Sequence, residues 1–465
     1  MAASVTKGQI HQGVVIMDKF IFPKDFRWGV ATAAYQIEGG AGADGKGESI
    51  WDRFCHAPDK IANGDTGDTA CDHYHRYSQD IKLMKKLGLK NYRLSLAWSR
   101  LFPNGTGALN QKGADFYSRL IDELLQQGIE PMVTLYHWDL PQALQDRGGW
   151  GNGDIADWFA DYATGAFELL GDRVKTWLTH NEPWVVAYAG HRQGRHAPGL
   201  TDFGLAVQVS HNLMLSHAKA VQVYRGANHP GGRIGIALNL YPITAASDAP
   251  ENQEAARRAD GYHNRWFLDP VLRGEYPQDM LKFFQESFGT PSISPGDLEL
   301  LKSNPVDFLG INYYFRKIVK HGSIDPVLHL AEVKPESSQY TAMNWEIHPQ
   351  SLTELLVAIA KNYNNPAIVI TENGAAFADS PTANGAVDDD DRLAFLRGHF
   401  EEAHRAIQAG VRLEGFYVWS LLDNFEWACG YDKRFGLIYV DYPTQQRTFK
   451  KSALWYRDVI KANGL

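Results

Sequence analysis

Cysteine is scarce in this sequence. Its 465 residues include three cysteines, Cys55, Cys71 and Cys429. The number is odd and no two of them form a Cys-x-x-Cys pair, which argues against a disulfide framework or a structural zinc site. Cys429 lies in an aromatic segment, and we interpret it as a small buried thiol rather than a reactive group.

Long apolar runs are also missing. The N-terminal stretch Val14-Val15-Ile16-Met17 is too short for the core of a signal peptide, and no run approaches the length of a membrane span. We therefore expect a cytoplasmic protein with no membrane partner.

Several familiar binding signatures are absent as well. The sequence contains no His-Glu-x-x-His motif, no Walker loop and no dinucleotide fingerprint after a predicted strand, so we expect no metal and no cofactor. The net charge of −8 argues against a nucleic-acid partner. The oligomeric state is left open.

What is present is typical of a folded enzyme, with 44% hydrophobic and 22% charged residues. The length allows several domains, but elaborated barrels also run past about 400 residues as one domain. We find no internal repeat and no linker. We predict a loosely ordered leader over residues 1–19 and one catalytic domain over residues 20–465.

Apolar runs and helical periodicity alternate along this domain. We expect strands over residues 26–34, 91–96, 131–136, 174–180, 233–239, 307–311, 367–371 and 413–420. Helices are expected over 74–87, 111–127, 155–170, 204–224, 253–267, 351–362, 389–409 and 451–462. Eight such units predict the α/β class and a single-domain (β/α)8 TIM barrel with long loops after its strands. The acidic run Asp388–Asp391 is interpreted as the solvated start of a helix.

Two of the strands end beside a glutamate. The run over residues 174–180 leads into Asn181-Glu182-Pro183, and Ala367–Ile370 leads into Thr371-Glu372-Asn373. Active sites of barrels lie at the carboxyl ends of the strands. A single such glutamate is more often an ion-pair partner or a cap, but that interpretation weakens for two, each beside an asparagine. Paired carboxylates suggest glycoside hydrolysis, retaining at a separation of roughly 5–5.5 Å and inverting at roughly 6.5–9.5 Å. The sequence leaves that distance open.

Hydrogen-bonding and aromatic residues follow the other strands. They are Gln36, Arg93, His137, Trp138, Asn312, Tyr314, Trp419, Glu426 and Trp427. Sugar hydroxyls need such polar partners, and the C–H faces of a sugar pack on aromatic rings. Taken singly, His137 is as often a core residue as a ligand, and Trp419 is more often core.

The ordered motifs resemble those of family 1 glycoside hydrolases, the β-glucosidases and their relatives, over residues 20–460. The matching segments are Phe26–Gly39, Tyr92–Ser95, His137–Asp139, Asn181–Pro183, Gly310–Tyr314, Ile370–Gly374 and Trp419–Trp427. His180 departs from the family pattern, in which an apolar residue is common before Asn-Glu-Pro. Alternation along the strand predicts that His180 faces the helices while Asn181 faces inward.

The resemblance implies a retaining mechanism with Glu372 as nucleophile and Glu182 as acid/base. It places Arg93, Tyr314 and Asn312 among the catalytic residues, with Arg93 and Tyr314 keeping Glu372 ionised. The implied sugar-binding residues are Gln36, His137, Trp138, Asn181, Trp419, Glu426 and Trp427, with Trp419 as the floor under the ring. Trp345 would form a wall of the leaving-group site.

Branches of the family are distinguished by single residues. Thioglucoside-cleaving members carry Gln where Glu182 stands, and 6-phospho-glycosidases carry Ser where Glu426 stands. A carboxylate at 426 would repel a phosphate dianion and bind two hydroxyls of a free sugar.

We therefore predict an exo-acting β-glucosidase for short oligosaccharides and for aryl or alkyl β-glucosides. Side activity on fucosides and galactosides, and transglycosylation, are further expectations. A 6-phospho-β-glucosidase and a non-catalytic sugar-binding barrel are the alternatives.

Overall fold

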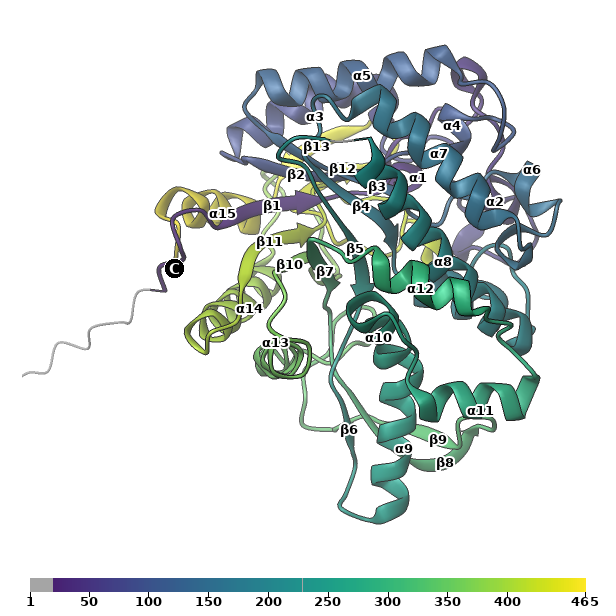
Figure 1. Cartoon of the computed structure of the whole chain (residues 1–465). Helices are drawn as coiled ribbons and strands as arrows, with labels where there is room; N and C mark the ends of the chain where they lie inside the picture. Colours follow the sequence, from purple (N-terminus) through teal and green to yellow (C-terminus); the bar gives the residue numbers. More distant parts are fainter. Residues whose placement is uncertain (1–19, 228) are drawn as a thin grey trace, which may run out of the picture.

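The computed structural model of the protein describes residues 20–227 and 229–465, and the predicted leader over residues 1–19 lies outside them. Within the described residues, parallel strands close into a barrel in the order β1-β11-β10-β7-β5-β4-β3-β2, and β2 pairs again with β1 (Figure 1). These strands are β1 Arg27–Ala31, β2 Asn91–Ser95, β3 Glu130–Tyr136, β4 Thr176–Asn181, β5 Arg233–Asn239, β7 Phe308–Asn312, β10 Ile368–Asn373 and β11 Leu413–Trp419. The predicted (β/α)8 barrel is confirmed.

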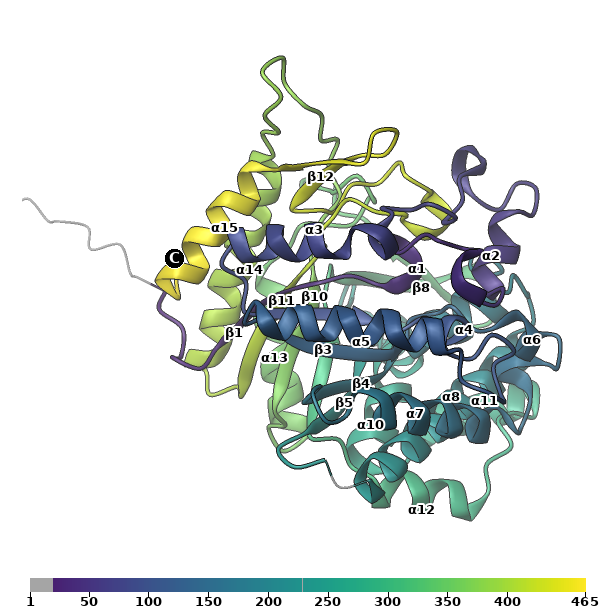
Figure 2. The same ribbon diagram turned by 90° about the horizontal axis from the view of Figure 1, so that it is seen from above.

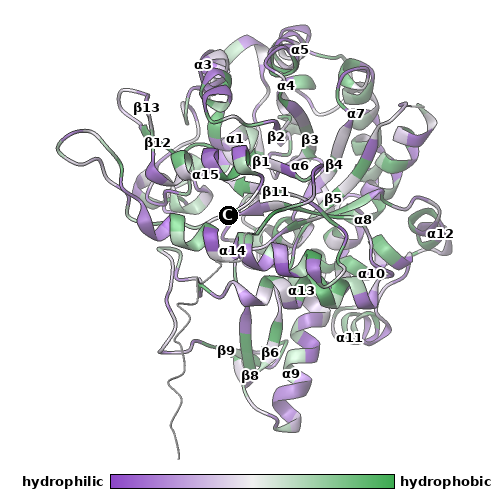
Figure 3. Cartoon of the chain, turned by 90° about the vertical axis from the view of Figure 1, so that its left-hand side faces the viewer, coloured by the Kyte–Doolittle hydropathy of each residue, from purple (hydrophilic) through white to green (hydrophobic). Residues whose placement is uncertain are grey.

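The barrel strands are buried on both faces, and β5, β7 and the first half of β10 are built mainly of apolar residues. All residues of β7 and β10 are buried, as expected for parallel strands with side chains inside the barrel and helices outside it. Figure 3 colours most of the barrel strands as hydrophobic, whereas α9 is largely hydrophilic.

The outer helices bury one stripe each against the barrel. In α7, buried residues recur every three or four positions, from Ile155 through Phe159 and Ala163 to Leu170. Figure 2 shows α3 and α5 running alongside the barrel strands. The main helices after the strands are α3 His73–Lys86, α5 Gln111–Gln126, α7 Ile155–Leu170, α8 Phe203–Gly226, α9 Pro250–Asp260, α10 Trp266–Arg273, α13 Gln350–Asn362, α14 Asp390–Gln408 and α15 Lys451–Ala462.

The loops after the strands carry further elements. The three-stranded sheet β6-β8-β9 packs against α9, below the barrel in Figure 1. The elements in the loops are β6 Ile243–Ala245, β8 Lys317–Asp325, β9 Leu330–Val333, β12 Ile438–Asp441, β13 Gln446–Phe449, α1 Ala34–Ile37, α2 Ile50–Cys55, α4 Trp98–Leu101, α6 Gln142–Gln145, α11 Gln278–Phe288 and α12 Pro295–Ser303. No helix of residues 20–227 and 229–465 is both long and apolar enough to cross a bilayer.

Two expected boundaries are wrong. The first strand was expected to continue to Ala34, but it ends at Ala31 and Gln36 lies in the short helix α1. The helix expected over residues 253–267 is interrupted by a wider π-helical turn, Gly261–Arg265, between α9 and α10. The small and β-branched residues before Gln36 favour a strand locally, and packing overrides that preference.

A buried ion network joins the last two strand-helix units. Lys450 bonds Asp379 at 2.5 Å and Asp423 at 2.7 Å, and all three side chains are almost fully buried. Arg392 bonds Asp379 and Asp389, and Arg434 bonds Asp423. Three cations therefore balance three carboxylates, which is the condition for charges to persist in an interior.

Asp389 corrects one expectation about the acidic run. Asp388, Asp390 and Asp391 are exposed at the start of α14, as predicted, but Asp389 is buried. Its carboxylate accepts bonds from Arg392 and from the hydroxyl of Ser452. Periodicity cannot reveal this burial, because Ser452 comes from another helix, α15.

We predict that Lys450→Met lowers the free energy of unfolding by about 3–5 kcal/mol, because it leaves Asp379 and Asp423 partly uncompensated in the interior. Denaturant unfolding measures the change. The matched control is Lys451→Met, which removes the neighbouring surface lysine paired with Asp390 and is expected to change the free energy of unfolding far less. Equal losses in the two variants would contradict the role of the network.

Candidate active site

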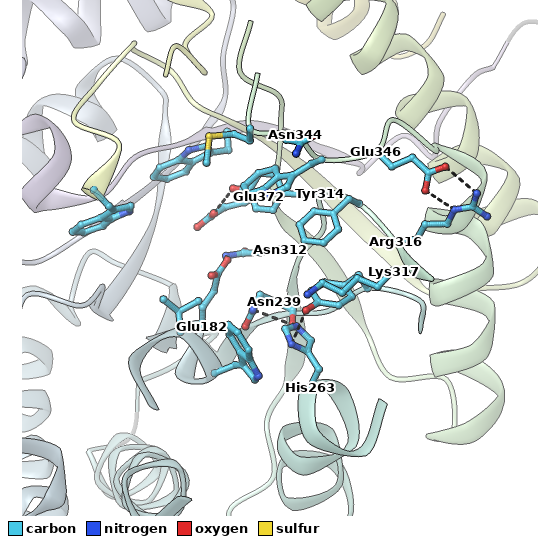
Figure 4. Close-up of a pocket in the computed structure, with 18 of the residues that line it drawn as sticks. Glu182, Asn239, His263, Asn312, Tyr314, Arg316, Lys317, Asn344, Glu346 and Glu372 are labelled. Atoms are coloured by element: carbon cyan, nitrogen blue, oxygen red, sulfur yellow. Dashed lines mark hydrogen bonds and ion pairs between the residues drawn. The ribbon is translucent and has the colours of Figure 1, made fainter. Parts of the chain in front are cut away.

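A cavity of about 420 Å³ opens at the carboxyl ends of the barrel strands. Figure 4 shows Glu182 and Glu372 reaching into it from different sides, with Asn312 between them. The predicted residues that line it are His137, Trp138, Glu182, Asn312, Tyr314, Trp345, Glu372, Trp419, Glu426 and Trp427. Gln36, Arg93 and Asn181 are fully buried behind this lining and bond to it.

Strand register places the central residues side by side. Asn312, the last residue of β7, pairs with Asn239 of β5 and with Glu372 of β10. Glu182 follows the last residue of β4, and its amide donates to the carbonyl of Ala237 at 2.8 Å. Adjacent parallel strands thus bring residues more than a hundred positions apart to one edge of the barrel.

Glu372 is held by a cation and a phenol. Arg93 Nη1 donates to Oε1 of Glu372 at 2.5 Å, and the Tyr314 hydroxyl donates to Oε2 at 2.6 Å. Burial raises the pKa of Glu372 above its usual value, and the charge of Arg93 and the bond from Tyr314 oppose that rise. Of the three carboxyls Glu182, Glu372 and Glu426, Glu372 is the one that pairs with an arginine among the described residues.

Glu182 has a different environment. The amide of Asn312 donates to Oε1 of Glu182 at 2.6 Å. Burial, and then the charge of Glu372, raise the pKa of Glu182 to about 8, against the opposing effects of Asn312 and Arg93. Glu182 therefore holds a proton at neutral pH, whereas Arg93 favours ionisation of Glu372.

Three residues of the cavity lining have a strained backbone conformation. Trp138, Glu182 and Trp427 adopt positive φ angles of 79°, 48° and 50°. This left-handed conformation costs a residue with a side chain roughly 1–2 kcal/mol. Strain of this kind persists where the surrounding structure imposes it, and here it directs three side chains into one cavity.

Asn181 connects the carboxylates to His137. Its side-chain oxygen accepts from Arg93 at 2.7 Å and from Asn312 at 2.9 Å, and its amide donates to Nε2 of His137 at 2.9 Å. The pKa of His137 lies well below its usual value because of burial and the charge of Arg93, so the ring is neutral. With Nε2 accepting, the proton is on Nδ1, which has no partner among the described residues.

The loop after β11 carries Glu426 beside Gln36. The Gln36 amide lies 3.0 Å from Oδ1 of Asn424, 2.9 Å from the carbonyl of Phe425 and 3.4 Å from Glu426. The Gln36 carbonyl oxygen is buried without a partner in the described part of the chain. Asp423 positions this loop, because it accepts from the amide of Gly436 and pairs with Lys450.

The structure does not favour the charge expected for Glu426. Burial, and then the charge of Glu372, raise the pKa of Glu426 to about 8, while Gln36 opposes the rise. Glu426 is therefore mostly protonated at neutral pH. Sequence reasoning assumed a carboxylate because it could not see that Glu426 pairs with no lysine or arginine of the described residues.

Aromatic rings form the walls. The rings of His137 and Trp419 lie nearly parallel with centroids 5.9 Å apart, and those of Trp138 and Trp427 are 4.6 Å apart. Trp345 lies 5.2 Å from the ring of Tyr314. The cavity thus combines flat apolar surfaces with amide and carboxyl groups.

His180 faces away from the cavity, as predicted from alternation along the strand. It bonds the hydroxyl of Ser216 in α8 and stacks on Phe159 of α7, with centroids 4.4 Å apart. Cys429, expected to be buried, is partly exposed and lines the cavity, because the short turn Trp427–Cys429 lies at its rim.

Sequence reasoning missed the lining residues Arg195, Tyr241, His263 and Lys317, and it left out Asn239, whose case was weaker than that of Asn312. Asn239 ends β5, so its position at a strand end was the available signal. The others come from long loops, which have no periodicity to locate them.

Comparison with known proteins gives one consistent result. Residues 18–465 match the family model described as Glycosyl hydrolase family 1. Beta-glucosidase A of Acetivibrio thermocellus is 52% identical over 96% of this chain and 100% of its own length. A 6-phospho-beta-glucosidase of Bacillus subtilis is 39% identical over 96% of this chain and 99% of its own.

A solved structure shares the fold at similar identity. The family 1 β-glucosidase of Thermotoga maritima in complex with isofagomine lactam is 50% identical, with a TM-score of 0.92. The match covers 96% of this chain and 100% of that one.

We predict that Glu426→Gln raises thermal stability in a pH-dependent way. The folded pKa of Glu426 is raised from 4.5 to about 8, so its burial costs nothing below pH 4.5 and progressively more as the pH rises to about 8. The gain is expected to be on the order of 1–3 kcal/mol at pH 8.5 and to vanish near pH 4.5.

Thermal melts across this pH range measure the effect. The control is Glu336→Gln, which neutralises an exposed glutamate and is expected to show no such trend. A gain that does not depend on pH would contradict the raised pKa of Glu426.

Proposed function

The chain belongs to glycosyl hydrolase family 1, and we propose that it is a retaining, exo-acting β-glucosidase. It removes terminal β-glucosyl units from short oligosaccharides and from aryl or alkyl β-glucosides. Relatives that are named beta-glucosidase, with 52% and 50% sequence identity to this chain, support this substrate class.

The observation that carries the proposal is the unequal pair of buried carboxyls. Arg93 and Tyr314 stabilise the charge of Glu372, while Glu182 has an amide partner and a pKa of about 8. One group is thus suited to attack as a carboxylate and the other to deliver a proton. This division is what the first step of glycoside hydrolysis needs.

The two steps follow from the coupling of these groups. Glu182 protonates the glycosidic oxygen as Glu372 attacks the anomeric carbon, which breaks the bond to the leaving group and forms a glycosyl-enzyme ester. The charge of Glu372 is then gone, so the pKa of Glu182 falls. Glu182 becomes the base that takes a proton from water, and the water displaces Glu372 with release of glucose.

The sugar is held by groups that lack protein partners. Nδ1 of His137 and the carbonyl oxygen of Gln36 are buried without partners among the described residues, so sugar hydroxyls satisfy them. Trp419 forms the floor under the ring and Glu426 binds outer hydroxyls. Asn181 holds the 2-hydroxyl. Fucosides, galactosides and alcohol acceptors are proposed as secondary substrates.

A 6-phosphate fits this site poorly. The relative that acts on 6-phospho sugars shows that the family includes such enzymes, but Glu426 pairs with no cation within residues 20–227 and 229–465. Ionisation of Glu426 would add repulsion to a dianion. A purely sugar-binding barrel would not need the distinct environments of Glu182 and Glu372.

We predict that Glu372→Ala abolishes turnover, because the nucleophile is lost, with the fold retained in a thermal melt.

Glu182→Ala is expected to slow the hydrolysis of alkyl glucosides by about 10²–10⁴-fold but that of nitrophenyl glucoside much less, because an activated phenolate needs little protonation. Steady-state assays of the two substrate types measure this. Equal losses on both substrates would argue against Glu182 as the acid.

We also predict that β-glucose is the first anomer formed from nitrophenyl β-glucoside, which NMR of the reaction detects. The 6-phosphate of this substrate is expected to be hydrolysed at least about 100-fold more slowly. First-formed α-glucose would overturn the retaining mechanism. Preference for the phosphate would assign the chain to the 6-phospho branch.

A further inference from the structure

The cavity extends beyond the two carboxyls on the side of Glu182. There its wall consists of residues from the loops after β4, β5 and β7, including Arg195, Asn239, Tyr241, His263 and Lys317. Figure 4 shows Lys317 beside the Asn239–His263 pair. A leaving group protonated by Glu182 departs toward this wall.

Positive charge is in excess on this wall. The lining includes Arg195, Arg316, Lys317 and Lys334 but only two further glutamates, Glu332 and Glu346. The excess is local, because the whole chain has a net charge of −8.

The existing ion pairs leave part of this charge unmatched. Arg316 makes a two-pronged pair with Glu346 at 2.8 and 2.9 Å, so that pair is neutral. Lys317 lies 3.6 Å from Glu332, and both side chains are partly exposed. Arg195 forms no ion pair with any residue in the described ranges.

The surroundings of Lys317 are such that a nearby anion would stabilise the charge of its ammonium group. Its ammonium is 5.3 Å from the centroid of the Tyr241 ring. Although part of its side chain is exposed, desolvation of the ammonium lowers the pKa of Lys317; Glu332 opposes this shift and the charge of Arg195 adds to it. The pKa of His263 is far below its usual value because of burial and Lys317, so His263 adds no charge.

Arg195 presents free donors at the mouth of the cavity. Its Nε donates to Gln193 at 2.7 Å and its Nη1 is 3.4 Å from His196, while its Nη2 bonds no described residue. A guanidinium is matched in shape to a carboxylate. Arg195 and Lys317 line the same wall of the cavity, so an anion bound against this wall would be attracted by both charges.

We propose that Arg195 and Lys317 form a leaving-group site for a carboxylate, so that β-glucosides of carboxylate-bearing phenols are preferred substrates. This inference rests on the proposed β-glucosidase activity. Glu332 is the competing internal anion, and its exposed position lets it turn to solvent when a substrate carboxylate binds. The carboxylate is held by the two cations while Glu182 protonates the phenolic oxygen.

The test compares two substrates of nearly equal shape, 4-carboxyphenyl β-glucoside and its neutral amide, 4-carbamoylphenyl β-glucoside. The measured quantity is the ratio of their kcat/KM values in the wild type and in the double variant Arg195→Gln/Lys317→Gln. Intrinsic leaving-group reactivity cancels in this comparison. We expect the double variant to lower the ratio by about 3- to 10-fold, and high salt to lower it in the wild type.

Lys320→Gln is the matched control. Lys320 lies on the same strand, β8, three residues beyond Lys317, but it is exposed and outside the cavity lining. Its ratio is expected to equal that of the wild type.

The outcomes separate the two proposals. If the wild type hydrolyses the amide but the double variant leaves the ratio unchanged, the carboxylate site is wrong and the β-glucosidase activity stands. An equal fall in the ratio for Lys320→Gln would show a diffuse effect of net charge and would also overturn the site. Hydrolysis of neither substrate, nor of nitrophenyl β-glucoside, would overturn the function and the inference with it.

Discussion

The buried ion pair between Arg93 and Glu372 is the interaction on which the site depends. Arg93 comes from β2 and Glu372 from β10, so the bond crosses the inside of the barrel. The same guanidinium also holds Asn181, and through Asn181 it orients His137 and Asn312. Without the cation, a buried carboxylate at 372 would take up a proton.

The charge that Arg93 stabilises acts on its neighbours. Burial, and then the charge of Glu372, raise the pKa of both Glu182 and Glu426, so both carboxyls favour the protonated form at neutral pH. Because the charge of Glu372 is consumed and restored during the proposed reaction, the protonation of Glu182 follows it. The barrel supplies the rigidity that such coupling requires, since the groups sit at the ends of paired strands.

Support for the site extends well outside the cavity. The network around Lys450 holds Asp423, and Asp423 holds the loop that brings Glu426 and Trp427 to the sugar. Lys450 and Asp423 lie outside the cavity lining, but they hold in place a loop in which Trp427 has a strained backbone. Stability and function are therefore linked through a buried set of charges, while the leaving-group wall, built from long loops, is where specificity has room to vary.

The sequence by itself determined the barrel and the edge at which the site lies. Apolar strands alternating with amphipathic helices leave few other arrangements, and the strands ending at Glu182 and Glu372 have to meet at one face. Only the tertiary structure decided that Glu426 lacks a cation among the described residues, that Asp389 is buried, and that Arg195 and Lys317 share one wall. Those properties depend on burial and on partners from distant segments, and neither is encoded in local pattern or spacing.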